Sequence, residues 1–133
     1  MKHWAAPLIG APYKAGASGP TEFDCIGLVR YYFRERRGLA LPDYDLAGGT
    51  AVELAAFVRA TRARRVGGEI QDEDIVTMEN FQGRHVGVAL RTAEGLGLLH
   101  AAGNNAKGSV VWQPMHTLVC YRNKQAWRLS CSN

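Results

Sequence analysis

Three residues of this sequence carry side chains that could together cleave an acyl bond. Cys25 supplies a thiol, and His85 and His100 supply two imidazole rings. An imidazole beside a thiol can take its proton, and a second imidazole can hydrogen-bond to the first ring and fix its orientation. Taken singly, a cysteine in an apolar helix is usually a small buried hydrophobe, and a strand histidine is usually a packed residue. Catalysis therefore depends on whether the fold brings the three together.

The sequence predicts that Cys25 lies in the first turn of a helix. Thr21 can cap this helix, Asp24 then occupies its third position, and Gly38 ends it after a basic run at 34–37. Unpaired N–H groups and the positive end of the helix dipole favour a thiolate at such a place. We therefore expect a reactive Cys25 whose pKa lies below the reference value of about 8.5.

A predicted hairpin brings the two histidines together. His85 begins the apolar run 85–91, His100 lies in the next run at 96–101, and residues 92–95 have the composition of a turn. Two imidazoles on neighbouring strands, together with an activated cysteine, favour the catalytic interpretation over the structural one.

The remaining pattern predicts an α+β fold with N-terminal helices packed on an antiparallel sheet. A capping box at Thr50–Glu53 opens a second helix, which closes at Gly67 and Gly68. From residue 74 the chain changes to short β-type runs separated by turns, so consecutive strands are expected to be antiparallel neighbours. These runs cover residues 74–78, 85–91, 96–101, 109–113, 118–122 and 126–129.

The composition is that of one globular domain over residues 1–133. The 133 residues are 47% hydrophobic and 21% charged. No apolar stretch approaches the ~20 residues of a membrane span, and the N-terminal stretch is too short for a signal peptide. We therefore expect cytoplasmic synthesis and no membrane span. The net charge of +4 favours polyanionic surroundings without naming one.

Other reactive or charged residues lack an informative motif. No metal-ligand or nucleotide-binding spacing occurs, and the cysteines contain no C-x-x-C pair, so we expect no metal, no cofactor and no disulfide framework. The arginine runs at 34–37 and 62–65 are expected to be solvated helix faces, although they could contact envelope polyanions. The residues interpreted as incidental are Cys120, Cys131, His3 and His116.

Several separate motifs resemble those of the NlpC/p60 cysteine peptidases. They are GAPYKAG at 10–16, GPTEFDCIGLV at 19–29, DIV at 74–76, HVGV at 85–88 and LLHA at 98–101. The resemblance implies a papain-like fold and hydrolysis of amide bonds in peptidoglycan stem peptides, commonly between γ-D-glutamate and diaminopimelate. It also implies that Cys25 is the nucleophile, His85 the base and His100 the orienting residue.

The same resemblance suggests three substrate-binding residues. Tyr13 matches a tyrosine beside the family's active site, and Asp24 matches an acid that holds the free amino end of the substrate. The alternatives are a packing aromatic for Tyr13 and a helix-capping acid for Asp24. Ile26 stands where the family commonly has serine, so it either lines the groove and shifts specificity or points into the core. The Cys25 N–H, with Tyr13 as a second donor, could form an oxyanion hole.

Within the family, the chain resembles the tail-associated phage and prophage members. The form Asp-Cys-x-Gly-Leu-Val-Arg at 24–30, followed by Leu-Pro-Asp-Tyr at 41–44, is similar to the tail assembly peptidase of lambda-like phages. The resemblance implies that stem peptides and phage tail proteins are partners, that nucleic acid is not, and that a tail particle carries the enzyme to the wall.

Three other functions fit the same residues. One is a thiol amidase or acyltransferase of the same fold, and another is an amidase toxin delivered by contact. A third is a tail assembly module without catalytic activity. The presence of Cys25, His85 and His100 argues against this last function, because degenerate members are expected to lose one of the three.

Overall fold

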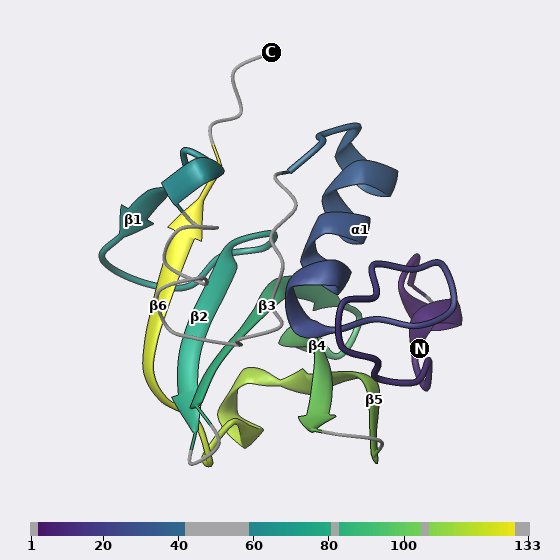
Figure 1. Ribbon diagram of the computed structural model, residues 1–133. Helices are drawn as coiled ribbons and strands as arrows, with labels where there is room; N and C mark the ends of the chain where they lie inside the picture. Colours follow the sequence, from purple (N-terminus) through teal and green to yellow (C-terminus); the bar gives the residue numbers. More distant parts are fainter. Residues whose placement is uncertain (1–2, 42–58, 81–82, 105–106, 130–133) are drawn as a thin grey trace.

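In the computed structural model, which describes residues 3–41, 59–80, 83–104 and 107–129, helix α1 packs against an antiparallel sheet (Figure 1). Helix α1 spans Cys25–Arg37, and the sheet order is β1-β6-β2-β3-β4-β5. The predicted α+β class is confirmed. The strands are β1 (Arg64–Val66), β2 (Ile75–Asn80), β3 (Gly83–Thr92), β4 (Gly95–Asn104), β5 (Lys107–Pro114) and β6 (Arg122–Arg128), with short 3-10 helices η1 (Ala6–Leu8) and η2 (Met115–Thr117).

Helix α1 begins later than the sequence predicted. Asp24, not Thr21, is the N-cap, and its side chain accepts a hydrogen bond from the Gly27 N–H at 2.6 Å. The residues before it are held as a loop by backbone bridges from Phe23 to Tyr13 and Ser18. The predicted end is confirmed, because Gly38 adopts the left-handed conformation with φ 64° and its N–H bonds to the helix.

The apolar side of α1 packs on the middle of the sheet. Ile26, Val29 and Phe33 are at most 2% exposed and share one core with Val88 of β3 and Leu99 of β4. Side chains alternate along a strand, so neighbouring positions of the same strands face the opposite side. There, Ala89 and Leu98 join a second apolar cluster that includes Leu118. None of the described helices is long and apolar enough to cross a membrane.

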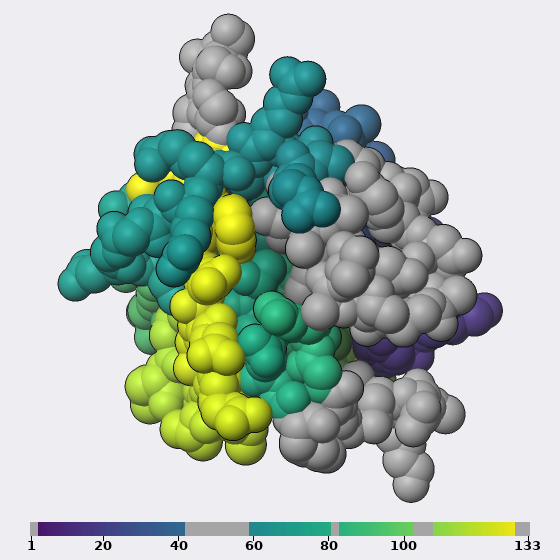
Figure 2. Space-filling view, turned by 60° about the vertical axis from the view of Figure 1, so that its left-hand side comes forward, coloured from purple at the N-terminus to yellow at the C-terminus, as the bar shows by residue number. Residues whose placement is uncertain are grey.

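The predicted second helix is wrong at its end. Residues 59 and 60 are helical, Arg62 turns the chain with φ 61°, and residues 64–66 form β1 instead of a last helical turn. In Figure 2 the yellow chain of β6 passes beside this teal segment, to which it is paired. The predicted start at Thr50 lies outside the described residues.

The C-terminal pairing also differs from the prediction. Strands β2 to β5 pair consecutively, but β6 returns to β2 instead of joining β5. Of the predicted strand 118–122 only Arg122 belongs to a strand, as the first residue of β6, because η2 and a turn occupy 115–120 and Leu118 is buried. Two long-range contacts stabilise the return of β6: Trp127 Nε1 donates to Thr77 Oγ1 at 2.9 Å, and Arg128 pairs with Asp74.

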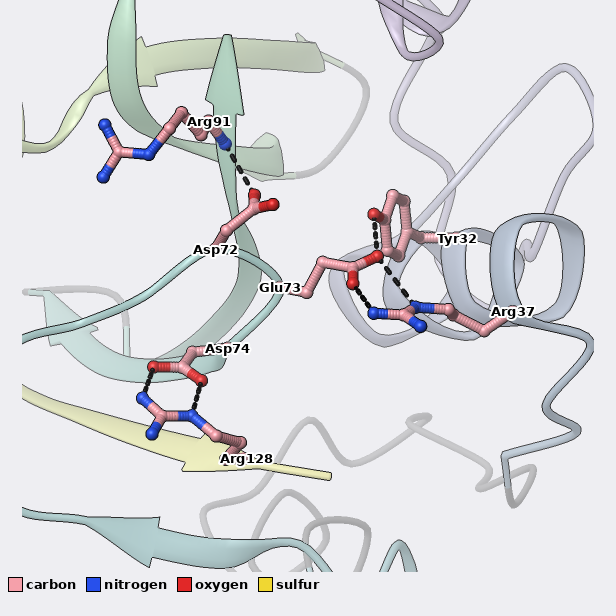
Figure 3. A network of polar contacts seen from close by, with 7 residues as sticks. All are labelled: Tyr32, Arg37, Asp72, Glu73, Asp74, Arg91 and Arg128. Atoms are coloured by element: carbon pink, nitrogen blue, oxygen red, sulfur yellow. Dashed lines mark hydrogen bonds and ion pairs between the residues drawn. The ribbon is translucent and has the colours of Figure 1, made fainter. Parts of the chain in front are cut away.

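Three acidic residues before β2 bind three different elements, namely β3, α1 and β6 (Figure 3). Asp74 is fully buried and binds the Arg128 guanidinium through two hydrogen bonds of 2.8 Å. Glu73 accepts from Tyr32 and Arg37 of α1, and Asp72 accepts from the backbone N–H of Arg91. Arg37 therefore has a structural partner, so the basic run at the end of α1 is not simply a solvated face.

Candidate active site

The N-terminus of α1 carries Cys25 and is tied to the preceding loop. Both carboxylate oxygens of Asp24 accept backbone N–H groups, Oδ1 from Gly27 at 2.6 Å and Oδ2 from Gly16 at 2.7 Å. A Cβ on Gly27 would lie 1.9 Å from the carbonyl oxygen of Ala17, so only glycine lets the loop pass this close. The motif Asp-Cys-Ile-Gly thus fixes the position of the helix start against the loop.

The sheet opens opposite this helix start. Pairing between β3 and β4 stops at Val88 and Leu99, whereas β3 continues along β2 to Gly83 and β4 continues along β5. His85 and His100 lie just beyond the last pair, one on each strand. The sulfur of Cys25 lies at this opening, where the backbone N–H of Val86 hydrogen-bonds to it and favours the thiolate. The helix start and both histidine-bearing strands therefore meet at one place.

The two histidines are joined directly. His85 Nε2 lies 2.8 Å from His100 Nδ1, and the rings are nearly perpendicular, at 76°. Gly87 makes the approach possible, because a Cβ there would lie 2.9 Å from the Cβ of His100 and 2.8 Å from the carbonyl oxygen of Leu99. On its other side His100 Nε2 lies 2.7 Å from Oε1 of Gln113. His85 is 8% exposed and His100 is fully buried.

Burial keeps both rings neutral. Desolvation, with a smaller contribution from His100, lowers the pKa of His85 to about 3. Desolvation also lowers the pKa of His100, and the hydrogen bond that its ring donates to Gln113 acts in the opposite direction. Neutral imidazole is the form that can accept a proton, so His85 has the protonation state that a general base needs.

The pKa predicted for the Cys25 thiol is wrong in direction for the free protein. Burial of the sulfur and then the charge of Asp24 raise the pKa of the thiol to about 12, although the residue as a whole is partly exposed. The helix dipole contributes only about 0.3 to 1 kcal/mol, so desolvation outweighs it. Cys25 is therefore a thiol at neutral pH, and its attack on a substrate requires a base that removes the proton.

Two aromatic rings lie beside these groups. Burial, Cys25 and Asp24, in that order, raise the pKa of Tyr13 to about 12, which places a protonated hydroxyl close to the thiol. The ring of Tyr121 stacks on that of His85 with centroids 5.3 Å apart and meets His100 edge-on. Tyr121 thus covers the histidine pair, whereas Tyr13 stands on the side of the nucleophile.

Comparison with known proteins identifies the family. Residues 10–124 match the NlpC/P60 family. The chain belongs to it. NlpC/P60 proteins are peptidoglycan hydrolases, and the family's members are cysteine peptidases and hydrolases.

The chain is also similar to two individual proteins. The gamma-DL-glutamyl hydrolase of Bacillus subtilis (strain 168) is 51% identical to the chain over 39 residues, which are 29% of this chain and 9% of that protein. Among solved structures, the NlpC/p60 domain of the peptidoglycan hydrolase SagA superposes with a TM-score of 0.59 at 19% identity, over 92% of this chain and 91% of that one. The fold is therefore the papain-like NlpC/p60 fold predicted from the motifs.

Of the six candidate site residues, the structure brings Cys25, His85, His100 and Tyr13 to one place. Asp24 lies beside them, but it is 3% exposed and both its oxygens bind backbone N–H groups, which is the capping alternative. Its contact with a substrate remains a prediction. Among the residues interpreted as incidental, Cys120 and His116 are exposed, His3 accepts a hydrogen bond from the Ala5 N–H, and Cys131 lies outside the described residues.

The sequence analysis missed Gln113 and Tyr121. Gln113 lies in a predicted strand, but no motif in the surrounding sequence indicates a functional role for its side chain. The register could have indicated it: Val111 pairs with His100, and Gln113 lies two residues further on the same face of β5. Tyr121 was hidden because residues 118–122 were predicted to form a strand instead of a turn.

Ile26 lies in the core of this NlpC/P60 domain and not in a groove. It is 2% exposed and packs with Val29 and Phe33, as the core alternative required. We expect Ile26→Ser to lower the free energy of unfolding by about 2 to 4 kcal/mol and to leave the ranking of substrates unchanged. Thermal unfolding and turnover of several stem-peptide variants measure both. A changed ranking with an unchanged melting temperature would instead place Ile26 in the groove.

The buried histidine pair predicts loss of stability in acid. The pKa of His85 falls from 6.5 in the unfolded chain to about 3 in the folded one. Below about pH 6.5 His85 binds a proton in the unfolded state but not in the folded state, so stability declines as the pH falls towards 3. Between pH 7 and 4 we expect His85 to account for a loss of about 3 kcal/mol.

Urea denaturation of the wild type and of His85→Phe at pH 7, 5.5 and 4 measures this contribution. The variant should lose less stability over that range, while His116→Phe, which changes an exposed histidine, should follow the wild type. Parallel curves for the wild type and His85→Phe would contradict the assignment.

Proposed function

We propose that the protein is a cysteine endopeptidase that cleaves amide bonds in the stem peptides of peptidoglycan. The observation that carries this proposal is that the Cys25 sulfur accepts the N–H of Val86, the residue after His85, where β3 and β4 part and His85 is hydrogen-bonded to His100. The NlpC/P60 membership supplies the substrate class, and the basic charge of the chain suits a polyanionic wall.

The reaction follows from the protonation states. His85 takes the proton of the Cys25 thiol while the sulfur attacks the carbonyl carbon, since both groups are neutral beforehand. The N–H of Cys25 belongs to the first helical turn, whose N–H groups lack intrahelical partners, and with the Tyr13 hydroxyl it stabilises the oxyanion. His85 then gives the proton to the leaving amine, and water hydrolyses the thioester with His85 again as base.

The bond proposed is that between γ-D-glutamate and diaminopimelate. The curated relative, which shares the 39-residue segment, is a gamma-DL-glutamyl hydrolase, and the SagA domain belongs to a peptidoglycan hydrolase. The first name agrees with a γ-glutamyl bond, and the second agrees with peptidoglycan as the substrate. We also propose that a phage or prophage tail particle delivers the protein, as the motif at 24–30 suggests.

Mass spectrometry of purified peptidoglycan incubated with the protein tests the activity and the bond together. We expect new fragments ending at γ-D-glutamate, absent with Cys25→Ala. Intact murein, with turnover of a lipid or of a γ-glutamyl amine instead, would support the acyltransferase or amidase alternative. If murein, the lipid and the γ-glutamyl amine all stay intact, the result would support the alternative of a tail assembly module without catalytic activity. Antibody detection of the protein in purified tail particles tests the delivery.

A further inference from the structure

Gln113 has only one orientation that satisfies its neighbours. Its Nε2 donates to Thr117 Oγ1 at 2.9 Å, and a weaker contact of 3.5 Å reaches the carbonyl oxygen of Thr117. The Thr117 hydroxyl donates its own hydrogen bond to the carbonyl oxygen of Pro114 at 2.6 Å, so it can only accept from Gln113. If the amide were flipped, Oε1 would face two acceptors, the hydroxyl oxygen and the carbonyl oxygen of Thr117. Oε1 of Gln113 therefore faces His100.

This orientation determines which ring nitrogens carry protons. Oε1 can only accept, so Nε2 of His100 carries the proton and donates at 2.7 Å. A neutral imidazole has one N–H, so Nδ1 of His100 is the acceptor for the His85 contact at 2.8 Å. Nε2 of His85 must then donate, which leaves its lone pair on Nδ1.

The lone pair on Nδ1 of His85 is available to the site. In the described part of the chain, this nitrogen makes no hydrogen bond, whereas the other three nitrogens of the two rings each have one. No buried side-chain nitrogen or oxygen there lacks a partner, so Nδ1 must keep some contact with solvent. Val86, the next residue, contacts the Cys25 sulfur through its N–H.

We propose that Gln113, held by Thr117, is a positioning residue that fixes the tautomers of His100 and His85 and thereby presents Nδ1 of His85 as the proton acceptor for Cys25. This inference rests on the proposed thiol chemistry. Gln113 acts through His100 and touches no reacting atom. The chain of hydrogen bonds runs from His85 through His100 and Gln113 to Thr117.

A neutral amide suits this position better than a carboxylate. An anion beside His100 would stabilise the imidazolium form and raise the pKa of the coupled pair, so that a larger fraction of His85 would be protonated and unable to act as a base. Glutamine accepts the hydrogen bond without adding charge. It also cannot take up the proton, so the chain of hydrogen bonds orients the base and carries no proton away from it.

Nitrogen NMR of the imidazole rings tests the proposal without any substrate. In the wild type at pH 7 we expect both His85 and His100 as the Nε2–H tautomer. Gln113→Leu should convert at least one ring to a mixture of tautomers, whereas Gln125→Leu on β6 should leave both spectra unchanged. Unaltered tautomers in a folded Gln113→Leu would overturn the proposal. This readout stays valid if peptidoglycan is not the substrate, so the two failures are distinguishable.

The pH dependence of kcat/KM provides the second test. Gln113→Leu should lower kcat by about 10- to 100-fold with little change in KM, because the base is misoriented while substrate contacts remain. Gln113→Glu keeps an acceptor but should shift the acid limb upward by at least about one pH unit. Thr117→Val should also lower kcat, because Gln113 would lose the partner that holds its amide. Lower melting temperatures with unchanged pH profiles and tautomers would show a purely structural role and overturn the inference.

Discussion

Cys25→Ala should lower the hydrolysis of peptidoglycan by at least about a thousandfold and leave the fold intact. The sulfur is the nucleophile of the proposed reaction, and alanine has no group that can replace it. Alanine is smaller than cysteine and favours a helix, so α1 should keep its cap at Asp24. Release of soluble fragments and far-UV circular dichroism measure the two effects.

Cys120→Ala provides the matched control for this variant. Cys120 is exposed in the turn before β6, so its replacement should retain the activity and the melting temperature. Wild-type turnover by Cys25→Ala would reject the thiol mechanism. If the Cys120 variant is inactive, that thiol takes part in the reaction and Cys120→Ala is not a valid control.

The second large effect concerns the unequal histidines. His85→Ala should lower kcat by about 10²- to 10⁴-fold, because it removes the proton acceptor. His100→Ala should cost less, and His100→Gln should retain part of the activity, because an amide can still accept the hydrogen bond from His85 Nε2. Steady-state kinetics at several pH values compare the three variants.

Stability must be measured alongside, because His100 is fully buried and its truncation leaves a cavity. His116→Ala removes an exposed histidine and serves as the control for loss of an imidazole. A His85→Ala enzyme with normal turnover would remove the proposed base. A His100 variant that is folded but more damaged than His85→Ala would reverse the two roles.

The sequence was informative where the chemistry is local. Cys25, His85 and His100 each lie in a short motif, and a helix start and a hairpin are sufficient to expect them at one place. The end of α1 at Gly38 is equally local, since a left-handed residue stops a helix wherever it occurs.

Features that depend on distant contacts were not predictable in this way. Thr21 and Asp24 are both able to cap a helix, and the bridges of Phe23 decided between them. The return of β6 to β2 depends on the burial of Asp74 against Arg128, 54 residues away along the chain. The direction of the Cys25 pKa depends on desolvation, which only the packed structure determines.

Gly87 has a consequence beyond the packing that it permits. A hydrogen bond between two rings tolerates only a few tenths of an ångström, and the separation of β3 from β4 at this point is set by a residue without a side chain. The distance between His85 Nε2 and His100 Nδ1 is therefore controlled by backbone spacing and not by the imidazoles themselves. Any side chain at position 87 would act as a spacer between the strands, so even the methyl group of an alanine there would push the two imidazoles apart.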